Sequence, residues 1–439
     1  MKRKKTVDPR KEGRALLLPN ETKKQSELVE SINNPVVRRP EMKVKGEVGE
    51  LTLRRSGFDT VFFVLVLILL AFGSVMVFSA SYADALARFD DSFYFAKKQL
   101  LFVFIALVIM PLAAWFPYKF YYRIADVLYL ITLGMLLLVL VIGFAGGGAQ
   151  RWFSLFGISV QPSEIAKVTL VLVLARFFSR NKESVLAHRK NRSLRGLEYR
   201  ITKRKNRRQS FLYGIVIPLA LIGTVDILVM LEKHISGLAI ITMLSLIVMF
   251  YAGSDWRWLA AIGLIGAGAI VLLITVFPYA TDRVLVWQDP YKYRLEGGWQ
   301  TIQGLYAIGS GGPFGLGLGE SRLKYSYVSQ PHNDFIFTIV CEELGFIGAL
   351  SVIVLFGLLV WRGMYIAKKA PDAFASITAF GISTHIAIQV LLNIAVVTNT
   401  MPNTGISLPF FSYGGSSLIV LAAEMGIMLS ISRYSYIRK

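Results

Sequence analysis

The chain has 439 residues, of which 54% are apolar and only 17% are charged, and its mean hydropathy is +0.53. An average soluble domain has about 25% charged residues, and soluble helices do not need the unbroken apolar runs of about 20 residues that recur in this sequence. This composition excludes disordered, collagen-like and disulfide-rich proteins, and the single cysteine, Cys341, excludes an intrachain disulfide or a Cys-based zinc site. We therefore predict an all-α, polytopic membrane protein.

The net charge of +20 is concentrated in three segments. Residues 1–57 contain 15 Lys and Arg against 8 Asp and Glu, residues 179–210 contain 12 against 2, and residues 432–439 add three basic residues. Basic runs can bind nucleic acid, but each of these runs adjoins an apolar span, which is the pattern of the positive-inside rule. We interpret them as cytoplasmic segments and expect no nucleic-acid partner.

The chain begins with a polar stretch, residues 1–57, that has no apolar period and is predicted to be a disordered cytoplasmic tail. No apolar core follows the first lysines, so a cleavable signal peptide is not expected. Residues 58–432 are predicted to form one transmembrane domain of about ten helices. The predicted spans are about 58–79, 99–116, 126–146, 162–179, 211–231, 235–252, 257–279, 334–361, 373–398 and 412–432.

An even number of spans places both termini on one side of the membrane, and Lys and Arg fall in the loops of that side, including the basic loop 179–210. We therefore predict a cytoplasmic N-terminus and a cytoplasmic C-terminal segment, 433–439. The longest outer segment, 280–333, joins the seventh and eighth spans and is rich in glycine and aromatic residues. We expect it to form short interfacial or re-entrant helices over a cavity that opens outward.

Motifs of soluble nucleotide enzymes do not fit. The stretch Gly309–Phe314 lacks the third glycine of a dinucleotide loop and follows no strand, and the sequence has neither a Gly-Lys pair for a Walker loop nor an HExxH zinc motif. An NTP-driven pump is therefore not expected. The informative residues are instead ionisable groups at the outer ends of the apolar spans, because such groups are costly in lipid.

The first group is His332-Asn333-Asp334-Phe335, which opens the eighth span. Asn333 or Asp334 could cap the helix by accepting hydrogen bonds from its free backbone amides. Alternatively, Asn333 is the cap and the Asp334 carboxylate faces the outer cavity. Both interpretations are consistent with the sequence.

The second group comprises Arg151-Trp152 and the stretch 161–167, in which Pro162 suits the first turn of a helix. Glu164 and Lys167 are three residues apart, so they share a helix face and can form an ion pair. The pair could be purely structural, or Lys167 and Arg151 could present positive charge to an anionic substrate. A third group, residues 401–417, contains two prolines and three glycines and predicts non-helical backbone that is buried in protein or lines a cavity.

Three stretches of this chain resemble the SEDS family (shape, elongation, division and sporulation): 161–167, 332–345 with the glycine-rich stretch before it, and 409–417. The resemblance covers about residues 58–432. Ser321-Arg322-x-Lys324-Tyr325, His-Asn-Asp-Phe and Cys341-Glu342-Glu343 are closer to the division and sporulation branch (FtsW, SpoVE) than to the elongation branch (RodA). The chain departs from the family at Lys233-His234, where members often have Pro-Asp.

The resemblance implies a peptidoglycan glycosyltransferase that polymerises lipid II at the outer face of the bacterial cytoplasmic membrane. It assigns Asp334 as the catalytic carboxylate, and a Mg²⁺ or Mn²⁺ ion is compatible with a hard oxygen ligand of this kind. The implied partners are a class B penicillin-binding protein, other divisome-type membrane proteins and membrane lipids. The predicted substrate-binding residues are Lys167, Arg151, Glu164, Trp152, Arg283, Arg322, Lys324, His332 and Ser416.

Three alternatives remain open from the sequence. A lipid-linked precursor flippase or transporter would also suit ten spans with broken helices, although no internal repeat relates the two halves. A RodA-type elongation polymerase would share the same chemistry. A scaffold would only position a partner transpeptidase.

Overall fold

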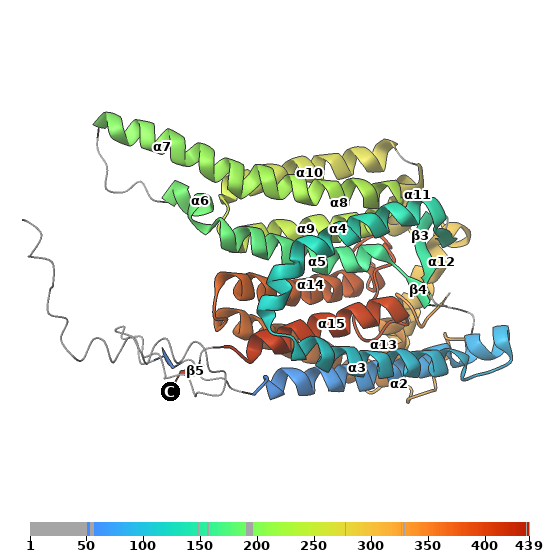
Figure 1. Cartoon of the computed structure of the whole chain (residues 1–439). Helices are drawn as coiled ribbons and strands as arrows, with labels where there is room; N and C mark the ends of the chain where they lie inside the picture. The colour runs from blue at the N-terminus through green and yellow to red at the C-terminus, as the bar shows by residue number, and fades with distance from the viewer. Residues whose placement is uncertain are drawn as a thin grey trace, which may run out of the picture. The chain divides into compact units, whose positions relative to one another are not determined.

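The computed structural model describes residues 51–52, 57–146, 149–155, 158–189, 196–276, 278–325, 327, 330–435 and 437–438. Residues 55–436 form one compact unit that is almost entirely helical (Figure 1). Leu51–Thr52 (β1) and Ile437–Arg438 (β5) pair as short antiparallel strands in a separate unit. Most of the predicted tail 1–57 lies outside the described residues.

Ten helices of the main unit coincide with the ten predicted spans. They are α2 (Thr60–Phe89), α3 (Tyr94–Trp115), α4 (Tyr118–Ile142), α5 (Pro162–Arg180), α8 (Ile217–Leu231), α9 (Ile235–Ala252), α10 (Trp256–Val276), α13 (Ile336–Lys368), α14 (Ala373–Val397) and α15 (Gly415–Ser432). Within the described residues, eight helices are long and apolar enough to cross a membrane, and α5 and α10 are not among them. The all-α membrane fold is therefore confirmed, whereas the exact number of crossings stays a prediction.

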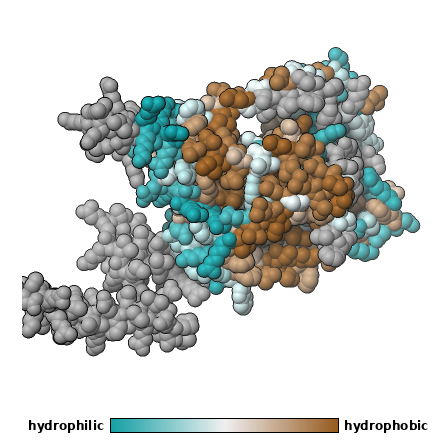
Figure 2. All heavy atoms as spheres, turned by 45° about the horizontal axis from the view of Figure 1, so that its top comes forward, coloured by the Kyte–Doolittle hydropathy of each residue, from teal (hydrophilic) through white to brown (hydrophobic). Residues whose placement is uncertain are grey.

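The centre of the bundle is built from α5, α14 and α15. Of the most apolar 18 residues of each helix, 72% are buried in α15 and 67% in α14, but only 17% in α3. Helix α3 packs along α15. The helices at the periphery of the bundle expose apolar side chains on its surface instead. Figure 2 shows a broad hydrophobic surface with hydrophilic residues to either side of it. This distribution is expected of helices that face lipid on one side and protein on the other.

An ion pair joins the start of α2 to the last third of α13. Asp59 caps α2 by accepting a hydrogen bond from the Phe62 amide, and the same carboxylate receives the Arg362 guanidinium at 2.9–3.0 Å. Arg362 lies in the last third of α13. The pair therefore fixes the end of α13 that is far from Asp334.

A small three-stranded antiparallel sheet follows α4 and occupies the connection between the third and fourth predicted spans, where the sequence analysis predicted no strand. It consists of β2 (Phe144–Gly146), β3 (Ala149–Leu155) and β4 (Ile158–Val160). The span predicted at 126–146 therefore ends at Ile142, because Gly143 takes an extended conformation. This sheet carries two predicted site residues, Arg151 and Trp152.

The basic segment predicted as a loop at 179–210 is largely helical in its described part. It contains α6 (Lys182–Val185), a 3₁₀ turn at Leu186–Arg189 (η1) and α7 (Gly196–Phe211), which continues through a π-helical turn at Leu212–Val216 (η2) into α8. Figure 1 shows α7 extending beyond the ends of the neighbouring helices. Lys, Arg and Gln are good helix formers, which explains why a run of charge without apolar period still forms a helix.

The segment 280–333, which is predicted to lie outside the membrane, contains short helices as the sequence predicts. They are α11 (Pro278–Gln288), a π-helical turn at Arg294–Gly298 (η3) and α12 (Trp299–Ser310). Trp287 of α11 donates its indole N–H to the Asn399 carbonyl at 2.9 Å, which ties this segment to the loop between α14 and α15.

Candidate active site

Asp334 lies half-buried in the turn before α13. The N-cap of α13 is the next residue, Phe335, and within the described residues no side chain makes a capping hydrogen bond there. Asn333 instead donates its side-chain amide to Gln330 Oε1 at 2.8 Å. The Asp334 carboxylate is therefore not used as a helix cap, which removes the structural interpretation considered for it.

The Asp334 carboxylate faces the loop between α14 and α15. A Cβ atom on Gly405 would lie 3.5 Å from Asp334 Oδ2, and Gly405 has a positive φ of 66°. Arg283 of α11 donates to the Asn403 carbonyl at 2.8 Å in the same loop. Burial raises the pKa of Asp334 above that of an ordinary aspartate, and the positive charge of Arg283 opposes this effect. A raised pKa makes this carboxylate a stronger base.

The turn that carries Asp334 is held by hydrogen bonds from two other elements. Asn393 of α14 donates its side-chain amide to the carbonyls of Asp334 and Ile406, at 2.8 and 2.7 Å. Ser412 Oγ donates to the Asn333 carbonyl at 2.8 Å. The predicted non-helical stretch 401–417 therefore packs against the Asp334 turn through hydrogen bonds. Sequence periodicity could not predict this contact.

Glu164 and Lys167 form the predicted ion pair in the first turns of α5. Lys167 Nζ lies 2.8 and 2.9 Å from the two carboxylate oxygens of Glu164. The Lys167 side chain is 3% exposed and that of Glu164 is 14% exposed. The pair is thus nearly buried but keeps one open side at the carboxylate.

Arg151 reaches the hairpin between α8 and α9, where it donates to the Lys233 carbonyl at 2.8 Å. Burial raises the pKa of the adjacent Glu232 to about 8, and the charge of Arg151 opposes this shift. Burial also lowers the pKa of His234 to about 4. The His234 ring lies 3.3 Å from Ser163 Oγ at the start of α5, next to the Glu164 and Lys167 pair.

This hairpin was not predicted as part of the site. The sequence signal was the tripeptide Glu232-Lys233-His234, which puts three polar residues between two apolar spans with almost no loop. Both carboxylate oxygens of Glu232 are buried and have no hydrogen-bond partner among the described residues. The positive charges of Arg151 and Lys167 both help to lower the pKa of His234, so both predicted cations lie near the hairpin.

The remaining predicted substrate-binding residues are distributed unevenly. Trp152 lies half-buried on β3 beside Arg151. His332 packs its ring 4.3 Å from the ring of Phe95 on α3, and burial lowers the pKa of His332 to about 4. Ser416 is buried in the first turn of α15, and its hydroxyl has no partner within the described part of the chain.

The structure does not support the predicted role of Lys324. Its side chain is 2% exposed, and its ammonium group lies 3.1 Å from Glu343 Oε1 and 2.5 Å from the Gly319 carbonyl. A cation buried in this way cannot reach a pyrophosphate without breaking the ion pair. Arg322, by contrast, has an exposed side chain, and its backbone amide donates to Glu342 at 2.9 Å.

A cavity lies beside the Glu164 and Lys167 pair, with an empty volume of about 370 Å³ that includes open solvent. It is enclosed by α5, α14, α15 and the loop 407–412. Its polar lining residues include Glu164, His385, Gln389, Ser407, Ser412 and Glu424. Ser412 also holds the Asp334 turn, so one loop connects this cavity with the candidate catalytic carboxylate.

A divalent cation remains a prediction. Among the described residues, no three His, Cys, Asp or Glu side chains come together as a metal site. Asp334 alone offers one carboxylate beside the backbone of Gly405. These residues do not by themselves form a protein-only metal cage, so no step below depends on a metal.

Comparisons with known proteins agree with this architecture. The FtsW/RodA/SpoVE family model, described as "Cell cycle protein", matches residues 59–437. Stage V sporulation protein E of Bacillus subtilis (strain 168) is 37% identical over 88% of this chain and 100% of its own length. A probable peptidoglycan glycosyltransferase FtsW of Geobacter sp. (strain M18) is 37% identical over 86% of this chain and 98% of its own.

Solved structures share the fold. A chain from a study of "polymerization and crosslinking by a peptidoglycan synthase complex" superposes with a TM-score of 0.67 at 28% identity, covering 86% of this chain and 98% of that chain. The rod shape determining protein RodA of Thermus thermophilus superposes with a TM-score of 0.61 at 27% identity, covering 87% of this chain and 98% of that chain.

Proposed function

Because this chain belongs to the FtsW/RodA/SpoVE family of cell cycle proteins, we propose that it is a peptidoglycan glycosyltransferase that polymerises lipid II into glycan strands. Relatives at 37% identity are named as a sporulation protein and as a probable FtsW glycosyltransferase, which supports a role in division or sporulation. An elongation role of the RodA type would use the same site.

The observation that carries the proposal is the Asp334 carboxylate. It is half-buried, faces the loop at Gly405 and is not used to cap α13. A carboxylate held in this way can accept a proton from a sugar hydroxyl. Its raised pKa brings it closer to neutrality, where a general base is most effective.

The reaction we propose is a direct displacement with inversion at the anomeric carbon. The acceptor hydroxyl oxygen forms a bond to the anomeric carbon of the donor, the bond from that carbon to the pyrophosphate oxygen breaks, and the hydroxyl proton passes to Asp334. A single base on the acceptor side is sufficient for inversion. Negative charge develops on the lipid-linked pyrophosphate as it leaves.

The cations near the site have different proposed roles. Arg283 lies close enough to Asp334 to affect its pKa and is bonded to the same loop, so it would meet ligand atoms at Asp334. Arg151 and Lys167 both lie near the α8–α9 hairpin and would stabilise pyrophosphate charge. Lys324 has no such role in this geometry because it is paired with Glu343.

The proposed location is the bacterial cytoplasmic membrane, with both termini cytoplasmic and Asp334 on the outer side. The charge distribution of the sequence supports this orientation. A solved relative comes from a peptidoglycan synthase complex, which supports a class B penicillin-binding protein as partner and lipid II as substrate.

The test is polymerisation by the purified full chain in detergent micelles that contain lipid II, with glycan chains resolved on a gel. Glycan chains longer than the disaccharide unit are the expected product. A flippase would need a bilayer with two sides and would make no glycan in micelles. A scaffold would be inactive alone and would produce glycan only when an active partner is added, and either result would contradict the proposal.

A further inference from the structure

α13 is interrupted at Gly345, where φ is 67° and ψ is −165°. The break separates an outer half-helix, residues 336–344, from the remainder of α13. The amides of Phe346 and Ile347 bond to the carbonyls of Gly312 and Pro313, at 2.8 and 3.1 Å. The outer half-helix therefore does not continue through regular α-helical geometry into the rest of α13.

The segment after α12 inserts at this break. The amides of Leu316 and Gly317 donate to the carbonyls of Glu342 and Glu343 at 3.0 Å each. A helix end leaves carbonyl groups without intrahelical partners, and non-helical backbone at membrane depth requires such internal bonds. The segment 311–317 thus forms part of the end of the outer half-helix.

Two glycines make this insertion possible. A Cβ atom on Gly311 would lie 1.9 Å from the Cys341 carbonyl oxygen, and one on Gly315 would lie 2.1 Å from the Glu343 carbonyl oxygen. Gly315 also has a positive φ of 80°. The glycine-rich stretch that fails as a nucleotide loop therefore serves close backbone packing against the outer half-helix.

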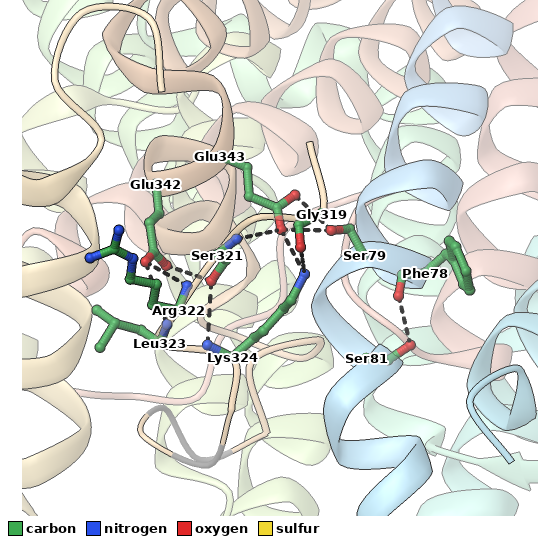
Figure 3. A network of polar contacts seen from close by, with 10 residues as sticks. All are labelled: Phe78, Ser79, Ser81, Gly319, Ser321, Arg322, Leu323, Lys324, Glu342 and Glu343. Carbon is green, nitrogen blue, oxygen red and sulfur yellow. Dashed lines mark hydrogen bonds and ion pairs between the residues drawn. The ribbon is translucent and has the colours of Figure 1, made fainter. Parts of the chain in front are cut away.

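The side chains at the end of the outer half-helix bind residues 321–324, which follow the inserted segment (Figure 3). Glu342 accepts hydrogen bonds from Ser321 Oγ at 2.5 Å and from the Arg322 amide at 2.9 Å. Glu343 accepts from Ser79 Oγ of α2 at 2.6–2.7 Å and pairs with Lys324 at 3.1 Å. We call the side chains of Ser79, Ser321, Lys324, Glu342 and Glu343 the outer clamp.

The outer clamp is sealed from solvent. Glu342, Glu343 and Lys324 are each at most 2% exposed. A buried polar network of this kind holds one arrangement, because moving any member leaves a buried charge or donor without a partner. The clamp thereby fixes the outer half-helix to α2 and to residues 321–324.

The other end of the outer half-helix leads directly to Asp334. Phe335 and Thr338 pack against Gly304 of α12, where an added Cβ would lie 3.0 and 3.4 Å from them. We propose that the outer clamp positions the outer half-helix and so holds the Asp334 carboxylate against the loop at Gly405. Its members are positioning residues for the reaction, and this role rests on the proposed function.

The first measurement is the kinetics of Ser321→Ala and Ser321→Thr in the detergent assay. Loss of the hydroxyl removes a bond to Glu342, and a displacement of a reacting group by about 1 Å can cost about 10²-fold in rate. We expect Ser321→Ala to lower kcat by about 10-fold or more, with KM for lipid II nearly unchanged. Ser321→Thr keeps the hydroxyl and should restore most of kcat.

The second measurement uses Cys341, which is the only cysteine of the chain and lies buried in the outer half-helix. Native protein is treated with N-ethylmaleimide, and the labelled fraction is followed by mass spectrometry. We expect the neutral double variant Glu343→Gln/Lys324→Met, which leaves no uncompensated charge, to be labelled at least about 10-fold faster than wild type. This readout does not depend on enzymatic activity.

The matched control is Arg362→Gln, which breaks the ion pair with Asp59 at the other end of α13. It should lower the unfolding temperature while leaving Cys341 labelling and kcat at wild-type levels.

Equal labelling in the clamp double variant and wild type would overturn the proposal. So would faster labelling with full kcat in both clamp variants, because the outer half-helix would then move without affecting Asp334. If wild type makes no glycan, the proposed function fails, while labelling still decides whether the clamp fixes the outer half-helix.

Discussion

Two buried Glu–Lys pairs occur in this protein and differ in what surrounds them. Glu164 and Lys167 are one turn apart on α5, and the carboxylate keeps 14% of its side chain exposed beside a cavity. Glu343 and Lys324 are 2% exposed or less, come from different segments, and have further partners in Ser79 and Gly319.

The difference separates a group that can bind a ligand from one that cannot. A sealed, saturated pair has no capacity left for a substrate, and its value is the single geometry that it enforces. An ion pair at the edge of a cavity can exchange part of its pairing for a ligand anion. The same two residue types therefore serve positioning in one place and are available for binding in the other.

The largest loss of activity is expected on substitution of Asp334. The losses expected from changes to the two Glu–Lys pairs are smaller. Asp334→Asn keeps the shape of the side chain but removes the base, and loss of a general base typically costs about 10²–10⁴-fold in rate. We expect glycan synthesis to fall by this factor in the detergent assay, while the protein remains folded by size-exclusion chromatography.

The control for this prediction is Asp91→Asn. Asp91 also lies in a turn before a helix, α3, where it accepts a hydrogen bond from the Phe93 amide at 3.0 Å. It should retain wild-type activity. Normal glycan synthesis by a well-folded Asp334→Asn protein would remove Asp334 from the catalytic role.

The second prediction compares the two pairs directly. Removing one partner of a buried pair costs about 3–5 kcal/mol in the free energy of unfolding, because the other charge stays buried. Lys324→Met should reach this range, and Lys167→Met should cost less because Glu164 can be hydrated from the cavity. Thermal unfolding in detergent measures both values.

The double neutral variants sharpen the same comparison. Glu164→Gln/Lys167→Met should regain stability but stay inactive if Lys167 contacts pyrophosphate. Full activity of Lys167→Met would discard the binding role. An equal loss of stability in Lys167→Met and Lys324→Met would show that the two pairs do not differ in the way described.

A third arrangement is Glu232, a buried carboxyl with no hydrogen-bond partner for either oxygen among the described residues. Its pKa rises from the ordinary 4.5 to about 8 on folding. Between these values the unfolded chain releases the proton that the folded protein keeps, so stability present below pH 4.5 is lost as the pH rises toward 8.

Glu232→Gln removes this titration. We expect its unfolding temperature to vary less between pH 5 and pH 8 than that of wild type, with the variant gaining relative stability at the alkaline end. Glu320→Gln, at an exposed carboxylate, is the control and should follow wild type. A parallel pH dependence in wild type and Glu232→Gln would contradict the burial effect.

Interactions between residues close in the sequence could be predicted from the sequence. Interactions between distant segments that meet at the Gly345 break in α13 could not. The Glu164 and Lys167 pair follows from helical spacing alone, and the all-α membrane fold follows from hydropathy. The Lys324 and Glu343 pair required the insertion of residues 311–317 at Gly345, which depends on two segments meeting in space. For the same reason Lys324 was predicted to bind substrate.

Two further failures have different causes. The sheet containing Arg151 was missed because its strands are short and the apolar pattern of α4 runs directly into β2. Helix α7 was predicted as a loop because its charge hides a strong helix propensity. In both cases the backbone conformation depends on helix propensity or on pairing between strands. Hydropathy does not report either property.

The smallest effect is expected from the charges that are neither sealed nor beside a cavity. In the described end of α7, four basic side chains are exposed: Arg204, Lys205, Arg207 and Arg208. Exposed charges contribute about 0–1 kcal/mol each to stability, whereas near an anionic lipid surface each is worth about 1 kcal/mol of attraction. Replacing all four with Gln should therefore leave glycan polymerisation in detergent within about two-fold of wild type.

In a Cys341→Ala background, a cysteine at position 205 should react with an impermeant thiol reagent only from the cytoplasmic side. Labelling from outside would reverse the orientation of α8 and, with it, the outward placement of Asp334, so this weakest substitution tests the premise on which the comparison of the two pairs depends.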